Sequence, residues 1–288
     1  MPARGADYAH FEKKAIIEYD AEMYDFAQEN FENAVRMNPS AYRSHAYLGH
    51  LAIKEGHRKE ALIHYNTSLS IRDDQPDVHF RAGSIYDYLM QYGKAQTHFL
   101  SAVEHDPSHL MAHVGLCRNY SLSGDFAAAN SHYTRAYELG KDRSTILLNE
   151  AEQMQDKGKA RTALLLLTRA IEVNPAHTEC YFKASTIRRG QRQYAEAIAI
   201  LQKLVYYRPH EERAWVHIAN IYYSQRVLGD KMRDYTAAIY SIRKALELNP
   251  DDIRYLELLE DCYKQTKDRD NYLKVREKID RLVEEDRF

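Results

Sequence analysis

Glycine and proline are scarce in this chain of 288 residues, which holds 11 glycines and 7 prolines. No stretch alternates apolar and polar residues between clusters of turn residues, as β-strands do. Without strands or glycine-rich loops, the sequence predicts an all-helical fold.

An excess of charge of either sign is also absent, because 40 basic residues face 42 acidic ones. A net charge of −2 gives no overall field that would attract nucleic acid or an anionic membrane. The 23 tyrosines fall mostly at packing positions, so we expect no stacking platform for nucleic acid. Neither a signal-peptide core nor an apolar run of about twenty residues occurs, so we expect a soluble, cytoplasmic protein without direct membrane insertion.

Cysteine and catalytic motifs are equally sparse. Cys117, Cys180 and Cys262 form no CxxC pair, so neither a disulfide nor a cysteine metal site is predicted. The sequence contains no HExxH, GxSxG, GxGxxG or phosphate-binding GxxxxGK[ST] motif. We therefore expect no enzyme activity, no cofactor and no catalytic residues.

What the chain does contain is a repeat of thirty-four residues. Alanines recur at that spacing, and a seventh follows after forty-one residues: Ala27, Ala61, Ala95, Ala129, Ala163, Ala197 and Ala238. A large side chain stands four residues after each alanine, and in most repeats a small one stands three residues further on. Because side chains at these spacings share one face of a helix, each repeat predicts a helix that packs closely against another.

Prolines stand just after this helix in most repeats, at Pro39, Pro107, Pro175, Pro209 and Pro250. A residue without an N–H ends one helix and allows the next to begin. Asp73 and Lys141 occupy the proline position in the second and fourth repeats.

These columns resemble the tetratricopeptide repeat (TPR) family. Tyr47-Leu48-Gly49 with Ala61 and Tyr65 follows the family pattern, and so does Trp215 with Tyr222, Ala238 and Pro250. The resemblance extends from about Tyr8 to Arg281. It implies an all-α, right-handed α-solenoid, a superhelix of antiparallel helix pairs.

The predicted organisation is a tail over residues 1–7, seven units over 8–252 and a capping helix pair over 253–288. The units start near residues 8, 42, 76, 110, 144, 178 and 212, with turn glycines at Gly56, Gly93 and Gly124. Seven extra residues around 226–232 either lengthen both helices of the last unit by two turns or form a longer loop.

Histidines and arginines raise two further possibilities. His45, His79 and His113 are one repeat apart, and so are His64, His98 and His132; both series fall at packing positions. Repeats about 10 Å apart cannot bring such a series to one ion, so no metal site is predicted. The cluster of Arg188, Arg189 and Arg192 either binds an anion or is a solvated helix end.

In TPR proteins the first helix of each unit lines a concave groove, and the resemblance transfers that role to this chain. The groove positions are Arg43, His50, Ile53, Lys54, Phe80, Ser84, Tyr88, Met111, Val114, Arg118, Leu122, Leu148, Glu152, Gln155, Phe182, Arg189, Arg213, Val216, Asn220 and Tyr223. This apolar and aromatic surface with arginines at intervals suits an amphipathic helix or an extended peptide that has hydrophobic anchors and an acidic group.

One kind of partner is disfavoured. TPR proteins that hold a chaperone's C-terminal tail use a lysine followed four residues later by an asparagine, whereas here Val216 precedes Asn220. The expected function is a non-enzymatic scaffold or adaptor that binds a partner protein in the groove, with Phe80→Ala or Arg118→Glu weakening the complex. The alternative is an architectural subunit of a larger assembly, bound through its ends and convex face.

Overall fold

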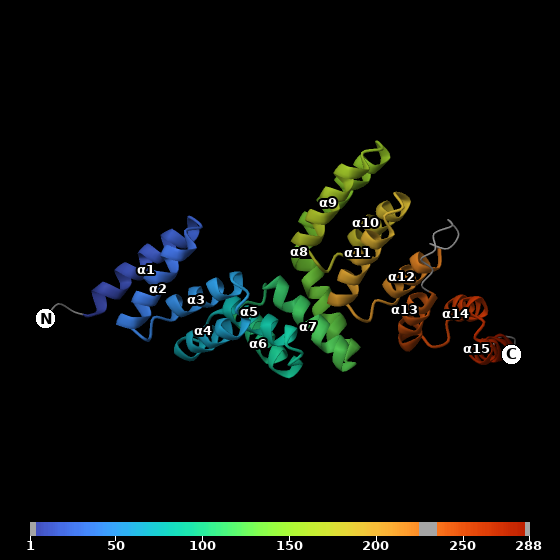
Figure 1. Cartoon of the computed structure of the whole chain (residues 1–288), viewed down its shortest axis with the longest axis horizontal. Coiled ribbons are helices and arrows are strands. Elements are labelled where there is room, and N and C mark those ends of the chain that lie inside the picture. The colour runs from blue at the N-terminus through green and yellow to red at the C-terminus, as the bar shows by residue number, and fades with distance from the viewer. Residues whose placement is uncertain (1–3, 225–234, 286–288) are drawn as a thin grey trace. The chain divides into compact units, whose positions relative to one another are not determined.

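The computed structural model describes residues 4–224 and 235–285, and all of the regular secondary structure in these two ranges is α-helix (Figure 1). The all-α class and the array of antiparallel helix pairs are confirmed. The insertion predicted around 226–232 lies outside the described residues. Within the described part of the chain, no helix is both long and apolar enough to cross a membrane.

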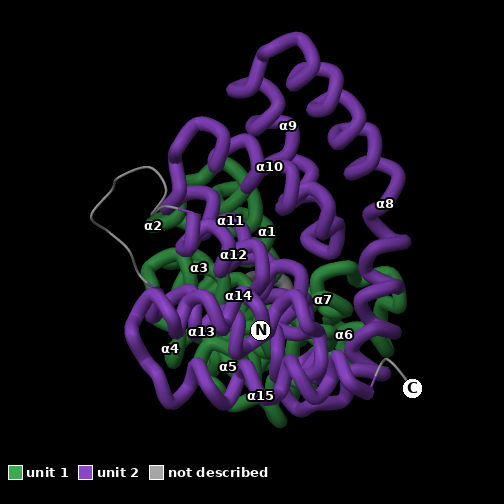
Figure 2. Tube along the Cα trace, turned by 90° about the vertical axis from the view of Figure 1, so that its right-hand side faces the viewer, with its two compact units in different colours: residues 1–119 green, residues 120–288 purple. Residues whose placement is uncertain are grey.

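The chain divides into two compact units, residues 1–119 and 120–288 (Figure 2). The helices of the first unit are α1 (Arg4–Asp20), α2 (Tyr24–Met37), α3 (Tyr42–Lys54), α4 (Arg58–Ile71), α5 (Pro76–Tyr88), α6 (Tyr92–His105) and most of α7 (Leu110–Ser123). Those of the second are α8 (Phe126–Asp156), α9 (Ala160–Val173), α10 (Thr178–Gly190), α11 (Tyr194–Tyr207), α12 (Glu212–Ser224), α13 (Tyr235–Leu248), α14 (Ile253–Thr266) and α15 (Arg269–Glu285).

The alanine column forms the contact between paired helices. All seven alanines are 0% exposed, and so are Phe31, Tyr65, Leu201 and Ile242 four residues further on. A small side chain lets the partner helix approach closely, and the large neighbour fills the space that remains. The repeat in the sequence is therefore the repeat of the packed helix pairs.

Helix α8 departs from the prediction, since it runs over 31 residues without the break expected ahead of Ser144. The chain has no proline between Pro107 and Pro175, and Lys141 in the proline column keeps its N–H. Asp73 also replaces a proline, but there the helix still ends, because Pro76 follows three residues later as the first residue of α5. The missing proline thus fuses the second helix of the fourth predicted repeat to the first helix of the fifth.

A left-handed residue between the helices also recurs every thirty-four residues. The residues of this series, all with positive φ, are Glu22 (61°), Gly56 (85°), Met90 (58°), Gly124 (81°), Gly158 (70°) and Arg192 (60°); Lys267 (62°), at the end of α14, lies outside the series. The prediction of turn glycines is confirmed at Gly56 and Gly124 but wrong at Gly93, which is the second residue of α6. Three of the six turns hold a side chain in a conformation that favours glycine.

Candidate functional site

The predicted groove residues lie on the first helices of the repeats: α3, α5, α7, the C-terminal half of α8, α10 and α12. Arg43, Lys54, Tyr88, Leu122, Gln155, Arg189 and Arg213 are exposed, whereas His50, Ile53, Phe80, Ser84, Met111, Arg118, Glu152, Val216, Asn220 and Tyr223 are partly buried. Each compact unit has a cavity along these helices.

In the first unit a cavity of about 330 Å³ lies among α1, α3 and α5. Its lining residues are Ile16, Tyr42, Arg43, Ala46, Tyr47, His50, Gln75, Pro76, Asp77 and Val78. The exposed Arg43 guanidinium lies 5.8 Å from the centre of the Tyr42 ring and donates a hydrogen bond of 3.1 Å to the Tyr42 hydroxyl. The cavity therefore combines an aromatic wall with a cation at its mouth.

His50 is one of the lining residues of this cavity. Its ring centre is 5.5 Å from that of Tyr47 and 5.6 Å from that of Tyr65, and its Nε2 atom is buried without a hydrogen-bond partner. Burial, aided by the charge of Arg81, lowers the pKa of His50 from 6.5 to about 4. At neutral pH the imidazole is therefore uncharged, and it acts as an aromatic surface.

In the second unit a cavity of about 290 Å³ lies among α8, α10 and α12. It is lined by Gln155, Glu179, Phe182, Lys183, Thr186, Arg213 and His217. The exposed Arg213 guanidinium lies 4.6 Å from the centre of the Phe182 ring. Lys183 is neutralised by an ion pair of 2.7 Å with Glu152, which leaves Arg213 as the cation above an aromatic ring.

Three predicted groove residues are buried instead of open to a partner. Val114, Leu148 and Phe182 are 4%, 8% and 5% exposed, and each packs in the core beneath the first-helix face. The Phe182 ring still forms part of the wall of the second cavity. Val114 and Leu148 therefore offer little surface to a partner, because the packing of neighbouring helices already uses their side chains.

The side chain of Arg118 also forms an ion pair inside the protein. Its guanidinium forms an ion pair with the buried carboxylate of Asp87, which accepts a second hydrogen bond of 3.0 Å from Asn119. Removal of one partner from a buried ion pair destabilises the fold. The predicted use of Arg118→Glu as a probe of binding is therefore wrong, since the new carboxylate would face Asp87.

The other groove side chains have local contacts. The ring of Phe80 lies 5.1 Å from that of His109, and Lys54 donates a hydrogen bond of 3.0 Å to Tyr24. Tyr88 is 61% exposed, and Tyr223 donates to the carboxylate of Asp261. These contacts leave Tyr88 as the most open aromatic group of the predicted set.

The histidine column has a structural role that the sequence did not reveal. In five repeats the side chain at this position contacts the carbonyl oxygen six residues earlier. The pairs are His45 Nε2–Pro39 O at 3.1 Å, His79 Nε2–Asp73 O at 3.1 Å, His113 Nε2–Pro107 O at 3.2 Å, Tyr181 Oη–Pro175 O at 3.2 Å and Trp215 Nε1–Pro209 O at 2.9 Å. Histidine, tyrosine and tryptophan share an N–H or O–H donor, and this common property was the available signal.

The arginine cluster on α10 is divided by the fold. Arg188 lines a cavity of about 760 Å³ against Leu164, Leu165 and other α9 residues, where its guanidinium donates a hydrogen bond of 2.6 Å to Gln193. Arg189 is the next residue of the helix, and Arg192 lies in the left-handed turn. The three arginines are not gathered at a single cavity, which favours the solvated helix end over an anion site.

Comparisons with known proteins match this architecture. A family profile described as tetratricopeptide repeat matches residues 13–76 and 182–253. The TPR repeat-containing protein YpiA of Bacillus subtilis is 24% identical over 219 residues, which cover 75% of this chain and 50% of YpiA. Superkiller complex protein 3 of Mus musculus is 26% identical over 243 residues, or 79% of this chain and 15% of that protein.

Among solved structures, a tetratricopeptide repeat protein from Parabacteroides merdae is 19% identical. The match covers 88% of this chain and 97% of that chain, with a TM-score of 0.47. By contrast, the match covers only 50% of the length of YpiA and 15% of the length of Superkiller complex protein 3. The repeat columns, the helix pairs and the family match agree, and the chain is a tetratricopeptide repeat protein.

Proposed function

We propose that the chain is a non-enzymatic scaffold or adaptor that binds a partner peptide or helix along its first-helix face. The observation that supports this is a feature common to both cavities. Arg43 and Arg213 occupy the same place in their repeats, five repeats apart, and each is exposed beside an aromatic ring at the mouth of a cavity of about 300 Å³.

The chemistry of these two places defines the partner. An arginine beside an aromatic ring presents a planar hydrogen-bond donor that suits a carboxylate, and the cavity next to it accepts an apolar or aromatic side chain. The fitting ligand is a peptide or amphipathic helix that carries a hydrophobic anchor next to an aspartate or glutamate. Both units contain such a place, so each unit binds such a segment independently.

A selection from a library of displayed peptides, with purified protein as bait, tests this proposal. We expect the enriched peptides to contain an aromatic or aliphatic residue close to an acidic one. Fluorescence polarisation with these peptides then compares wild type with Arg43→Glu and Arg213→Glu, and each reversal is expected to weaken binding at its own unit roughly tenfold or more.

Arg36→Glu on α2 and Arg169→Glu on α9 provide matched controls. Both arginines are exposed on second helices, and the substitutions make the same charge change. If the control pair weakens binding as much as the groove pair, or if the groove pair leaves it unchanged, the first-helix face is not the binding surface.

The second-helix face supports the alternative of an architectural subunit. Large apolar side chains are exposed there, among them Ile63 at 66%, Leu165 at 62% and Tyr240 at 57%. The relative from Mus musculus is named as a protein of the superkiller complex. A chain of this kind would keep its native partners in the Arg43→Glu and Arg213→Glu variants and lose them when these apolar residues become polar.

A further inference from the structure

Two residues in the first unit break the repeat pattern at positions that meet in space. Asp73 stands in the proline column. His105 stands in a column that is otherwise mostly apolar, with Met37, Ile71, Leu139, Val173 and Tyr207 at the equivalent places. Neither residue is required by the packing of a helix pair, since the other repeats pack without it.

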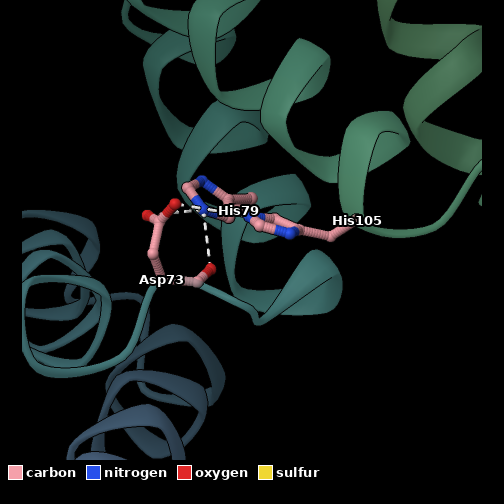
Figure 3. A group of neighbouring side chains, drawn as sticks. All are labelled: Asp73, His79 and His105. Atoms are coloured by element: carbon pink, nitrogen blue, oxygen red, sulfur yellow. Dashed lines mark hydrogen bonds and ion pairs between the residues drawn. The ribbon is translucent and has the colours of Figure 1, made fainter.

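The fold brings both residues to His79 (Figure 3). Asp73 lies in the connection between α4 and α5, His79 on α5 and His105 at the C-terminal end of α6. Asp73 Oδ1 is 3.2 Å from His79 Nε2, and Asp73 Oδ2 is 3.3 Å from His105 Nε2. One nitrogen from each histidine and a carboxylate oxygen all lie within 4.8 Å of one another.

The two nitrogen–oxygen distances, 3.2 Å and 3.3 Å, suit ligands of a small divalent ion. Zinc binds imidazole nitrogen and carboxylate oxygen at about 2.0–2.2 Å, so two ligands of a tetrahedral ion are roughly 3.3 Å apart. The side chain of His79 is 5% exposed and that of Asp73 is 71% exposed. The group therefore has a fixed inner ligand and an outer one that water and ions can reach.

The second nitrogen of each imidazole lies near a polar group. His79 Nδ1 lies 3.2 Å from His98 Nδ1, and His105 Nδ1 lies 3.8 Å from Asp74 Oδ1. Histidines that bind metal ions commonly donate their other N–H to such a partner.

From this geometry we infer that Asp73, His79 and His105 bind one zinc ion or a similar divalent transition metal, with water completing its coordination. Two imidazoles and one carboxylate are borderline ligands, which select zinc and its neighbours over magnesium or calcium. The site ties the connection before α5 to the end of α6.

Proton balance is maintained when the ion binds. When the His79 proton is on Nε2, that N–H donates to the carbonyl of Asp73, and His79 Nδ1 accepts from His98 Nδ1–H. In the bound state Nε2 takes the ion, the His79 proton lies on Nδ1 and is donated to His98 Nδ1, and the His98 proton lies on its Nε2. No net proton is released from the pair.

Isothermal titration of the purified chain with zinc chloride at pH 7.5 tests the inference, and cobalt(II) absorption spectra report the coordination. The variants restore the residues of other repeats: Asp73→Pro and His105→Leu. Proline is compatible at position 73 because Arg72 before it is already extended, with φ −144° and ψ 115°. His64→Leu is the control, since His64 pairs with His45 at 3.4 Å as His98 pairs with His79, and Leu166 fills its column.

We expect one zinc ion per chain in wild type and in His64→Leu, and a loss of affinity of at least roughly tenfold in Asp73→Pro and His105→Leu. Zinc should also raise the midpoint of thermal unfolding only in the chains that bind it. Circular dichroism confirms that each variant is folded. No binding by wild type, or binding that both substitutions leave unchanged, would overturn the inference and leave these residues as a hydrogen-bonded cluster only.

Discussion

Phe99 is held between two glycines, and this arrangement leads to a quantitative prediction for Gly83→Ala. A Cβ atom at Gly83 would lie 2.8 Å from Phe99 Cδ1 and 3.2 Å from the carbonyl oxygen of Ala95. At the opposite edge of the ring, a Cβ atom at Gly115 would lie 2.7 Å from Phe99 Cε2. Phe99 is 2% exposed, so its ring cannot turn out into solvent.

Two opposing effects set the magnitude. Replacement of a helical glycine by alanine normally stabilises a helix by about 1 kcal/mol. Overpacking of a filled core costs about 1–3 kcal/mol, and the upper end applies because the ring is confined at two opposite edges. We therefore expect Gly83→Ala to lower the free energy of unfolding by about 2 kcal/mol.

Urea denaturation followed by circular dichroism measures this change, with Gly93→Ala as the matched control. Gly93 is also helical and exposed, and a Cβ atom there would meet nothing within 4 Å. The double variant Gly83→Ala with Phe99→Leu should lose less unfolding free energy than the two single variants lose together. The smaller side chain at position 99 leaves room for the new methyl group. Equal stability of Gly83→Ala and Gly93→Ala would refute the steric argument.

Two further predictions concern the turns and the pH dependence. Met90 has a φ of 58° and is 75% exposed, so Met90→Gly relieves strain at little loss of packing and should stabilise the chain by about 0.5–1 kcal/mol, as a raised thermal midpoint would show. The folded-state pKa of His50 is about 4, below the ordinary 6.5, so the buried neutral ring contributes stability that is present above pH 6.5 and is lost as the pH falls toward 4. That difference corresponds to at most about 3 kcal/mol. Between pH 7 and pH 4.5, the unfolding free energy of His50→Leu should therefore fall by less than that of wild type. Equal falls would contradict the assignment of this pH dependence to His50.

The helix pairs could be predicted from the sequence because one small residue and its large neighbour recur at a fixed period. The end of a helix depends on fewer residues, and here the prediction failed. Lys141 was seen to replace a proline, but only the absence of any later proline before Pro175 allows α8 to continue. The left-handed residue at Met90 was missed since turns were sought at glycines, whereas the backbone geometry of the repeat imposes this conformation on any side chain.

The candidate site was only partly predictable for a different reason. Position in a repeat identifies the helix that carries a side chain, but it does not reveal which contacts that side chain already makes. Arg118 is bonded to Asp87 and Phe182 is 5% exposed, although both occupy groove positions. The Asp73, His79 and His105 cluster was missed because the histidines were compared only at a spacing of one repeat, whereas the cluster joins two different columns.

Helix α8 changes how its part of the array responds to force and to thermal fluctuation. In most repeat arrays a terminal unit can unfold by breaking its contacts with one neighbouring unit only. The 31 residues of α8 act as a continuous strut of about 46 Å that belongs to two predicted repeats at once. Those two repeats are therefore mechanically coupled, and neither can come apart without bending or melting the helix that the other depends on.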